Sequence, residues 1–133
     1  MIDKNRLVRL TQKLVQFDSV NPPGNELAVS KFIAKDMRSL GLEVKTVSFQ
    51  KDRPNVIATL KGAWPRQRAA KEAVLITPHI DTVLFGSGWT FKPAGGQIHK
   101  GRIYGRGASD DKGNCAVGME ALRSLVEDGV RLK

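Results

Sequence analysis

Two short apolar runs, set between stretches with helical periodicity, constrain the fold of this chain more than any other feature. Residues 56–60 (Val-Ile-Ala-Thr-Leu) and 74–77 (Val-Leu-Ile-Thr) are apolar almost throughout. Short continuous runs of this kind are typical of strands whose two faces are both covered. They predict two inner strands of a sheet that has other elements packed on each side.

Three stretches of the chain have the apolar spacing of amphipathic helices. We expect the first to begin after Asp3 as N-cap, the second after Asn25 as N-cap, and the third near Cys115. Gly41 and Gly129 are placed to end the second and third in a left-handed turn. The repeating apolar positions are Leu7, Leu10, Leu14 and Phe17, then Val29, Phe32, Ile33, Met37 and Leu40, then Cys115, Met119, Leu122 and Val126.

The remaining chain predicts a further strand at residues 42–49 and a small hairpin at 97–104 around Lys100-Gly101. Helices that alternate with buried strands are typical of the α/β class. We expect a partial three-layer sandwich, with helices on both faces of a mixed, largely parallel sheet. In such sheets ligands bind at the carboxyl ends of the strands, which directs attention to the residues that follow position 77.

Composition excludes several classes of function. A length of 133 residues suits about one domain, and 41% hydrophobic with 26% charged residues is typical of a globular chain. The net charge of +9 favours anionic partners, but the basic residues are scattered rather than interleaved with aromatic ones, so we expect no nucleic-acid partner. No apolar stretch approaches membrane-spanning length, and the single Cys115 fits a reducing compartment. We therefore expect no membrane partner and a cytoplasmic location.

The first candidate site is His79, which follows directly after the run at 74–77, with Asp81 two residues later. In extended backbone two residues at this spacing face the same way. An imidazole that binds a metal usually donates its other ring N–H to a carboxylate, and Asp81 is placed to accept it. Taken alone, this spacing favours a structural or solvent-exposed histidine over a metal ligand.

The second candidate is the pair Asp110-Asp111, which ends a glycine-rich loop and precedes the third helix. Glycines allow turns that present acidic groups in a tight geometry. The alternative is an acidic N-cap that satisfies the first N–H groups of the helix, and for Asp111 this interpretation stands.

Taken together, four motifs resemble a known family, the zinc-dependent aminoacylases and exopeptidases of clan MH. Acetylornithine deacetylase, succinyl-diaminopimelate desuccinylase, carboxypeptidase G and the cytosolic dipeptidases are members. The motifs are Asn-Pro-Pro-Gly-Asn-Glu at 21–26, Pro-His-Ile-Asp-Thr-Val at 78–83, Trp89 with Pro93, and Gly-Arg-Ile-Tyr-Gly-Arg-Gly-Ala-Ser-Asp-Asp-Lys-Gly at 101–113. They extend over nearly the whole chain.

This resemblance implies that His79 is a zinc ligand, that Asp110 bridges two zinc ions, and that Asp81 orients His79. It also implies the cleavage of an amide bond in an N-acyl amino acid or a dipeptide, because paired metal ions polarise a carbonyl and stabilise the developing oxyanion. The metal expected is zinc, with cobalt or manganese as alternatives, since imidazole and carboxylate ligands suit several divalent ions.

The same resemblance implies that part of the site is missing. The family's acidic pair, which includes the general base, follows the next strand, and Glu127-Asp128 would lie about 25 Å from Asp110 along a continuous helix. We expect residues 1–133 to be the N-terminal part of the catalytic domain, without the lid or dimerisation domain through which a homodimer is possible. A catalytic zinc needs about three protein ligands, so we expect this chain alone to bind zinc weakly and to hydrolyse nothing appreciable.

Two other interpretations remain open. One is a non-catalytic, basic binding or interaction domain derived from the same fold. The other is a site completed by association of identical chains, which would require His99 or Glu120 to contribute. For His99 itself we expect an exposed turn residue, and for Cys115 a core residue. Trp89 is expected to pack the site loop, and Arg106 to pair with a carboxylate.

Overall fold

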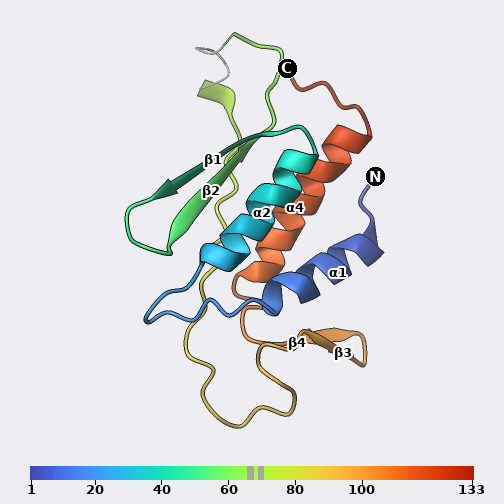
Figure 1. Ribbon diagram of the computed structural model, residues 1–133. Helices are drawn as coiled ribbons and strands as arrows, with labels where there is room; N and C mark the ends of the chain where they lie inside the picture. The colour runs from blue at the N-terminus through green and yellow to red at the C-terminus, as the bar shows by residue number, and fades with distance from the viewer. Residues whose placement is uncertain (66–67, 69–70) are drawn as a thin grey trace.

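The computed structural model describes residues 1–65, 68 and 71–133. Its elements are α1 (Lys4–Val15), α2 (Leu27–Ser39), β1 (Glu43–Ser48), β2 (Pro54–Thr59), β3 (Gln97–His99), β4 (Arg102–Tyr104) and α4 (Lys112–Glu127). Figure 1 shows α1 beside α4, α2 against the ribbon formed by β1 and β2, and the small β3–β4 hairpin near the start of α4. The fold is therefore α/β, as predicted.

The helices begin and end largely as the sequence predicts. Asp3 caps α1, and its side chain accepts a hydrogen bond from the Arg6 N–H at 3.0 Å. The prediction of Asn25 as the second N-cap is wrong: the N-cap of α2 is Glu26, which makes no side-chain capping bond because its carboxylate binds Arg53. Gly41 follows α2 in the left-handed region, with φ of 77°. In the described part of the chain, no helix combines the length and apolar character needed to cross a membrane.

The core lies between α1, α2 and α4 and one face of the β1–β2 ribbon. Leu14 of α1, Met37 of α2 and Ala116 of α4 are at most 1% exposed, and they belong to one cluster. Burying a leucine or methionine side chain stabilises the fold by about 1.5–3 kcal/mol. The predicted apolar stripes of all three helices are thus confirmed as core-facing. They hold the start of α4 close to the end of α1.

The expected largely parallel sheet is wrong. β1 and β2 pair antiparallel, from Glu43 opposite Thr59 to Ser48 opposite Pro54. The short connection at residues 49–53 permits only this arrangement, because parallel neighbours need a crossover of a dozen or more residues. Along β2 the side chains alternate between half-buried and exposed, so β2 covers the core with one face and is not an inner strand.

Residues 74–77 do not form the second expected strand. They belong to neither a helix nor a strand, and Val74 and Leu75 are 89% and 81% exposed. Apolar composition favours burial, but a strand also needs a partner for its backbone, and no strand in the described residues pairs with this segment. The three-layer sandwich is therefore absent from the described residues. Their parallel pairing is limited to a single bridge between Val20 and Thr82.

Candidate metal centre

The structure brings His79 and Asp110 together. The ring Nε2 of His79 lies 2.9 Å from Oδ1 of Asp110, although 31 residues separate them in the chain. Upstream of His79, the side chain of Ile76 lies against Gly118 of α4. The His79 backbone N–H donates to Oδ2 of Asp111 at 3.2 Å. These contacts hold the segment that carries His79 against the first turns of α4.

Asp81 lies on the other side of the imidazole. Its Oδ1 is 3.2 Å from Nδ1 of His79, and its backbone oxygen is 3.1 Å from the same nitrogen. Both oxygens accept hydrogen bonds, so Nδ1 is the ring atom placed to donate and Nε2 the atom aimed at Asp110. The spacing argument for the pair is thus confirmed in geometry. The role of Asp81 in orienting a metal ligand stays a prediction.

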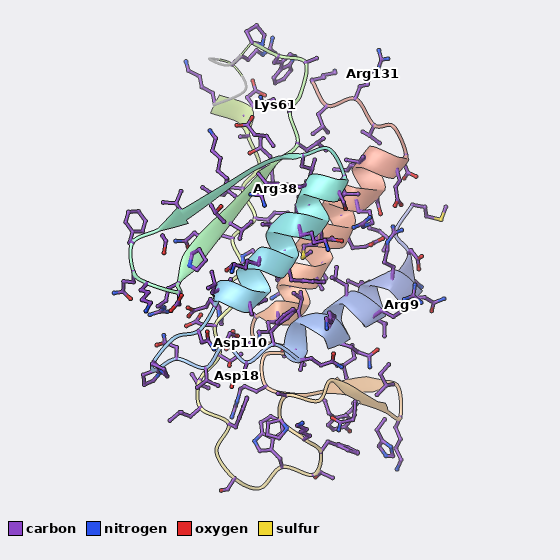
Figure 2. All side chains as sticks on the ribbon, viewed as in Figure 1. Arg9, Asp18, Arg38, Lys61, Asp110 and Arg131 are labelled. Carbon is purple, nitrogen blue, oxygen red and sulfur yellow. The ribbon has the colours of Figure 1, made fainter. Side chains whose placement is uncertain are left out.

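The loop before α4 depends on a glycine to present its acidic residues. Gly107 has φ of 85°, and a Cβ there would lie 2.9 Å from Cγ2 of Thr82 and 3.1 Å from Cδ of Lys112. Any side chain would push the loop away from its neighbours. Figure 2 shows the labelled Asp110 at the end of the helices where this loop meets α4.

Asp111 occupies the N-cap position of α4 but makes no side-chain capping bond. Its carboxylate accepts instead from the His79 backbone and from the side-chain amide of Asn114. The interpretation of Asp111 as an ordinary capping carboxylate is therefore wrong. Asp111 joins the two segments that carry His79 and Asp110.

Lys112 was not singled out from the sequence, yet it is 1% exposed. Its Nζ donates to the backbone oxygen of Phe17 at 2.8 Å and so ties the start of α4 to the end of α1. Burial lowers the pKa of Lys112 to about 8, since desolvation disfavours the charged ammonium. Nothing in the one-dimensional pattern distinguishes this lysine from the many exposed ones.

The electrostatics of the pair follow from its contacts. The hydrogen bond to Asp110 raises the pKa of His79 above its ordinary value, against a smaller opposing effect of desolvation. For Asp81, burial acts to raise the pKa, but the hydrogen bond from Asn21 and the nearby charges of His79 and Arg53 outweigh it, and the pKa is lowered. Asp81 is therefore held as a carboxylate beside the ring.

Asp81 is itself supported by residues that the sequence analysis passed over. Nδ2 of Asn21 donates to Oδ2 of Asp81 at 3.0 Å. Nη2 of Arg53 lies 3.7 Å from the same oxygen and 3.1 Å from Oε1 of Glu26. Asn21 and Glu26 were noted only as parts of a motif, and Arg53 not at all. The sequence offered one signal for them. Two polar residues, Asn21 and Glu26, flank the Pro-Pro-Gly turn, and the turn itself does not require either of them.

An open pocket of about 210 Å³ lies over the site and is lined by His79, Asp81, Trp89, Arg106 and Asp110, among others. Arg106 does not meet the carboxylate expected for it. Its Nη2 donates to the backbone oxygen of Phe85 at 3.1 Å, and its guanidinium lies 5.1 Å from the ring of Trp89. The indole N–H of Trp89 donates to the same oxygen at 2.6 Å. Trp89 and Arg106 thus pack the wall of the pocket.

The donors present fit part of a divalent-metal site. Two atoms that share one zinc at about 2.0–2.1 Å each lie at most about 4.2 Å apart, and the 2.9 Å between Nε2 and Oδ1 is within this limit. Imidazole nitrogen and carboxylate oxygen are also the ligand types that zinc accepts. In the described residues, however, no group of three or more His, Cys, Asp or Glu side chains converges to hold an ion.

The other candidate residues are engaged elsewhere. His99 ends β3 as an exposed residue, with its ring 5.3 Å from that of Phe91. Glu120 is completely buried and paired with Arg6. Cys115 is a core residue, as predicted, and burial raises the pKa of its thiol to about 11. Glu127 at the last turn of α4 also binds Arg6, at the opposite end of the helix from Asp110.

Comparisons with known proteins agree on one relationship. The model of Peptidase family M20/M25/M40 matches residues 75–133, the part that contains His79, Asp81 and Asp110. An N-formyl-4-amino-5-aminomethyl-2-methylpyrimidine deformylase of Halalkalibacterium halodurans is 29% identical over 98% of this chain and 31% of its own length. Succinyl-diaminopimelate desuccinylases of Pseudoalteromonas atlantica and Methylocella silvestris are 29% and 31% identical, over 90% and 92% of this chain and 30% and 31% of their own. The chain spans less than a third of the length of these curated relatives.

Proposed function

Since the chain is a relative of Peptidase family M20/M25/M40, we propose that it carries the first part of a metal-dependent amidohydrolase site. In this proposal His79 and Asp110 are ligands of a divalent metal, and Asp81 orients His79. The observation that carries it is the position of the His79 ring, with Nε2 2.9 Å from Asp110 and Nδ1 3.2 Å from Asp81. An imidazole with a carboxylate on its second nitrogen is the arrangement that metal-binding histidines usually have.

The roles of the chain's own residues follow from these contacts. Asp81 keeps the ring proton on Nδ1, so the lone pair of Nε2 is available for a metal. Asp110 is 90% exposed at its side chain, which leaves its second oxygen free for another ion. Trp89 and Arg106 close one wall of the pocket. A divalent metal at this position would act as a Lewis acid on an amide carbonyl, and zinc is the first candidate, with cobalt or manganese as alternatives.

The substrate class proposed is an N-acyl amino acid or a dipeptide. The relatives are named for the removal of formyl and succinyl groups. Removing an acyl group from nitrogen breaks an amide C–N bond by hydrolysis. We place residues 1–133 in the N-terminal part of the catalytic domain of a longer protein. The general-base pair, further metal ligands and a second domain able to form a homodimer would lie outside these residues. An unpaired, buried Cys115 fits a reducing compartment such as the cytoplasm.

For this chain alone, the proposal implies weak zinc binding and no appreciable hydrolysis. His79 and Asp110 supply two ligands, whereas a catalytic zinc normally has three from the protein. Neither Glu120, which is buried under Arg6, nor His99 in its hairpin supplies the third.

The basic binding domain is the second candidate, because the chain keeps a net charge of +9 after all its carboxylates are counted, although some of its arginines are paired internally. Arg6, Arg53 and Arg123 each lie within 3.1 Å of a carboxylate of the same chain. Cations that are already neutralised contribute little to the attraction of an anionic partner. Binding to nucleic acid that weakens steeply with salt would support this candidate.

The proposal is tested by zinc titration of the 133-residue chain in competition with a chromophoric chelator of micromolar affinity. We expect weak binding at one site, which His79→Ala and Asp110→Asn each abolish. His99→Ala is the matched control and should bind as the unmodified chain does. Two tightly bound zinc ions per isolated chain would contradict the incomplete site, and binding that survives both substitutions would contradict the site itself.

A further inference from the structure

We propose that Asn21 and Arg53 are positioning residues for Asp81, and that through Asp81 they fix which nitrogen of His79 carries the proton. Neither residue touches the imidazole. Both contact the carboxylate oxygen of Asp81 that faces away from the ring. The inference rests on the proposed function only where it takes Nε2 of His79 to be a metal ligand.

The two oxygens of Asp81 have separate partners. Oδ1 faces Nδ1 of His79 at 3.2 Å. Oδ2 accepts from Nδ2 of Asn21 at 3.0 Å and lies 3.7 Å from Nη2 of Arg53. A carboxylate held at one oxygen cannot rotate freely about its terminal bond, so its other oxygen stays directed at the ring. The direct hydrogen bond makes Asn21 the stronger of the two anchors.

The segment that carries Asn21 is fixed to the segment that carries Asp81. The Asn21 N–H donates to the oxygen of Thr82 at 2.8 Å, and the Thr82 N–H donates to the oxygen of Ser19 at 2.9 Å. The completely buried Ser19 adds a hydrogen bond from its Oγ to the oxygen of Ile80 at 2.7 Å. The amide of Asn21 is therefore presented to Asp81 by backbone that flanks Asp81 on both sides.

Arg53 is held by a separate anchor. Its Nε donates to both oxygens of Glu26 at 3.1 Å, and Glu26 is only 4% exposed. The arginine side chain passes over Gly24, where a Cβ would lie 2.7 Å from Nε and 2.8 Å from Cδ. The absence of a side chain at position 24 thus lets the guanidinium reach from Glu26 to Asp81. The buried Glu26 therefore restricts the positions that the Arg53 guanidinium can adopt beside Asp81.

The consequence concerns the neutral imidazole. Asp81 is 30% exposed at its side chain, whereas Asp110 is 90% exposed. Oδ1 of Asp81, held in place by its anchors, faces Nδ1 of His79 at 3.2 Å, whereas the Asp110 carboxylate at Nε2 is the more exposed of the two. The anchored Asp81 therefore selects the Nδ1–H tautomer, which leaves the Nε2 lone pair for a metal. Without the anchors, only the backbone oxygen of Asp81, 3.1 Å from Nδ1, remains fixed as an acceptor, so the preference for the Nδ1–H tautomer weakens.

The test combines two measurements on the full chain and its variants. Long-range ¹H–¹⁵N spectra of the metal-free protein at about pH 9, above the ordinary histidine range, report the tautomer of His79. Competition with a chelator reports the affinity for zinc alone. The variants are Asn21→Ala, Asn21→Asp, Arg53→Gln and Arg53→Lys. Ser30→Ala is the matched control, because the buried hydroxyl of Ser30 bonds to the oxygen of Pro54 beside Arg53 without reaching Asp81.

We expect the unmodified chain and Ser30→Ala to hold the Nδ1–H tautomer. Asn21→Ala and Asn21→Asp should give a mixture of tautomers and bind zinc about tenfold more weakly. Arg53→Gln should have a smaller effect, which Arg53→Lys partly restores because the positive charge is kept. Should one Asn21 variant fail to fold, the other still decides, since Asp retains the size of the side chain.

A single tautomer of the Nδ1–H form in both Asn21 variants would overturn the proposal, whatever their stability. The proposal would also be overturned if the Asn21 variants lost as much stability as Ser30→Ala and kept the zinc affinity of the unmodified chain. That result would make Asn21 a merely structural residue. The tautomer is read without metal. A chain that binds no zinc at all would therefore contradict the proposed function and leave the positioning of Asp81 to be decided by the spectra.

Discussion

Arg6 of α1 holds Glu120 of α4 through two hydrogen bonds, from Nε to Oε2 at 2.7 Å and from Nη2 to Oε1 at 2.9 Å. The backbone N–H of Asp3 adds a third to Oε1 at 2.9 Å. The Glu120 side chain is 1% exposed, and Arg6 is 28% exposed. This pair fixes the start of α1 along the helix whose other end presents Asp110. The stability of the candidate site therefore depends on a contact far from it.

Replacing Glu120 by Gln should lower the free energy of unfolding by about 2 kcal/mol at neutral pH, as measured by urea denaturation, because hydrogen bonds to a charged group are lost. Glu127→Gln is the matched control. Glu127 binds the same arginine but is 43% exposed, so its contribution should stay below about 1 kcal/mol. If the two substitutions lowered the free energy of unfolding equally, burial of the carboxylate would not determine the strength of its pairing with Arg6.

Glu120 should also impose a pH dependence on stability. The hydrogen bond from Arg6 lowers its pKa from 4.5 to about 2, although burial opposes the change. Between these values the unfolded chain binds more protons than the folded one, so stability is fully present above pH 4.5 and is lost as the pH falls towards 2. The loss should reach up to about 3 kcal/mol, and it should be absent from Glu120→Gln. Urea denaturation at several pH values in this range measures the loss of stability. If the stability of the unmodified chain and that of Glu120→Gln fell in parallel with pH, the role of Glu120 would be refuted.

Gly107→Ala should distort the loop that presents Asp110. The new Cβ would meet Cγ2 of Thr82 at 2.9 Å in addition to the strain of a φ of 85°. Gly41→Ala is the matched control, because Gly41 has φ of 77° with no atom within 4 Å of its added Cβ. Both should lose about 1–2 kcal/mol of stability from backbone strain, measured by urea denaturation. Only Gly107→Ala should lose zinc affinity in addition, and unchanged affinity would show that the loop adapts.

Cys115 should react slowly with iodoacetamide in the folded chain. Its thiol is 5% exposed, and burial raises its pKa to about 11, so little thiolate is present near neutral pH. Mass spectrometry should show slow alkylation in buffer and rapid alkylation in concentrated urea. Rapid alkylation of the folded chain would place Cys115 outside the core.

The elements that could be predicted from sequence are those whose signal is local. The apolar spacing of the helices, the Asp3 cap, the left-handed Gly41 and the turn at Lys100-Gly101 each depend on a few neighbouring residues, and the structure confirms them. The pairing of strands depends on distant residues. Residues 56–60 and 74–77 carry similar apolar signals, yet the first run pairs with β1 and the second pairs with no strand in the described residues.

The same distinction holds at the site. His79, Asp81 and Asp110 stood out because their types and spacing have chemical meaning, and the structure brings all three together. Asn21 and Arg53 did not, because their contacts with Asp81 arise only when segments 60 and 28 residues away fold onto it. Lys112 shows most plainly what sequence alone cannot predict. Its burial follows from the packing of α1 on α4 and from no feature of its own sequence neighbourhood.

The most direct test of a shared metal site at His79 and Asp110 is a zinc titration of the chain, monitored through the ring ¹⁵N resonances of its two histidines. We predict that zinc shifts Nε2 of His79, leaves its Nδ1–H in place, leaves His99 unchanged, and has no effect on the His79 ring in Asp110→Asn. Zinc that moves the His99 ring, or that binds His79 equally well without the Asp110 carboxylate, would contradict a common metal site for His79 and Asp110.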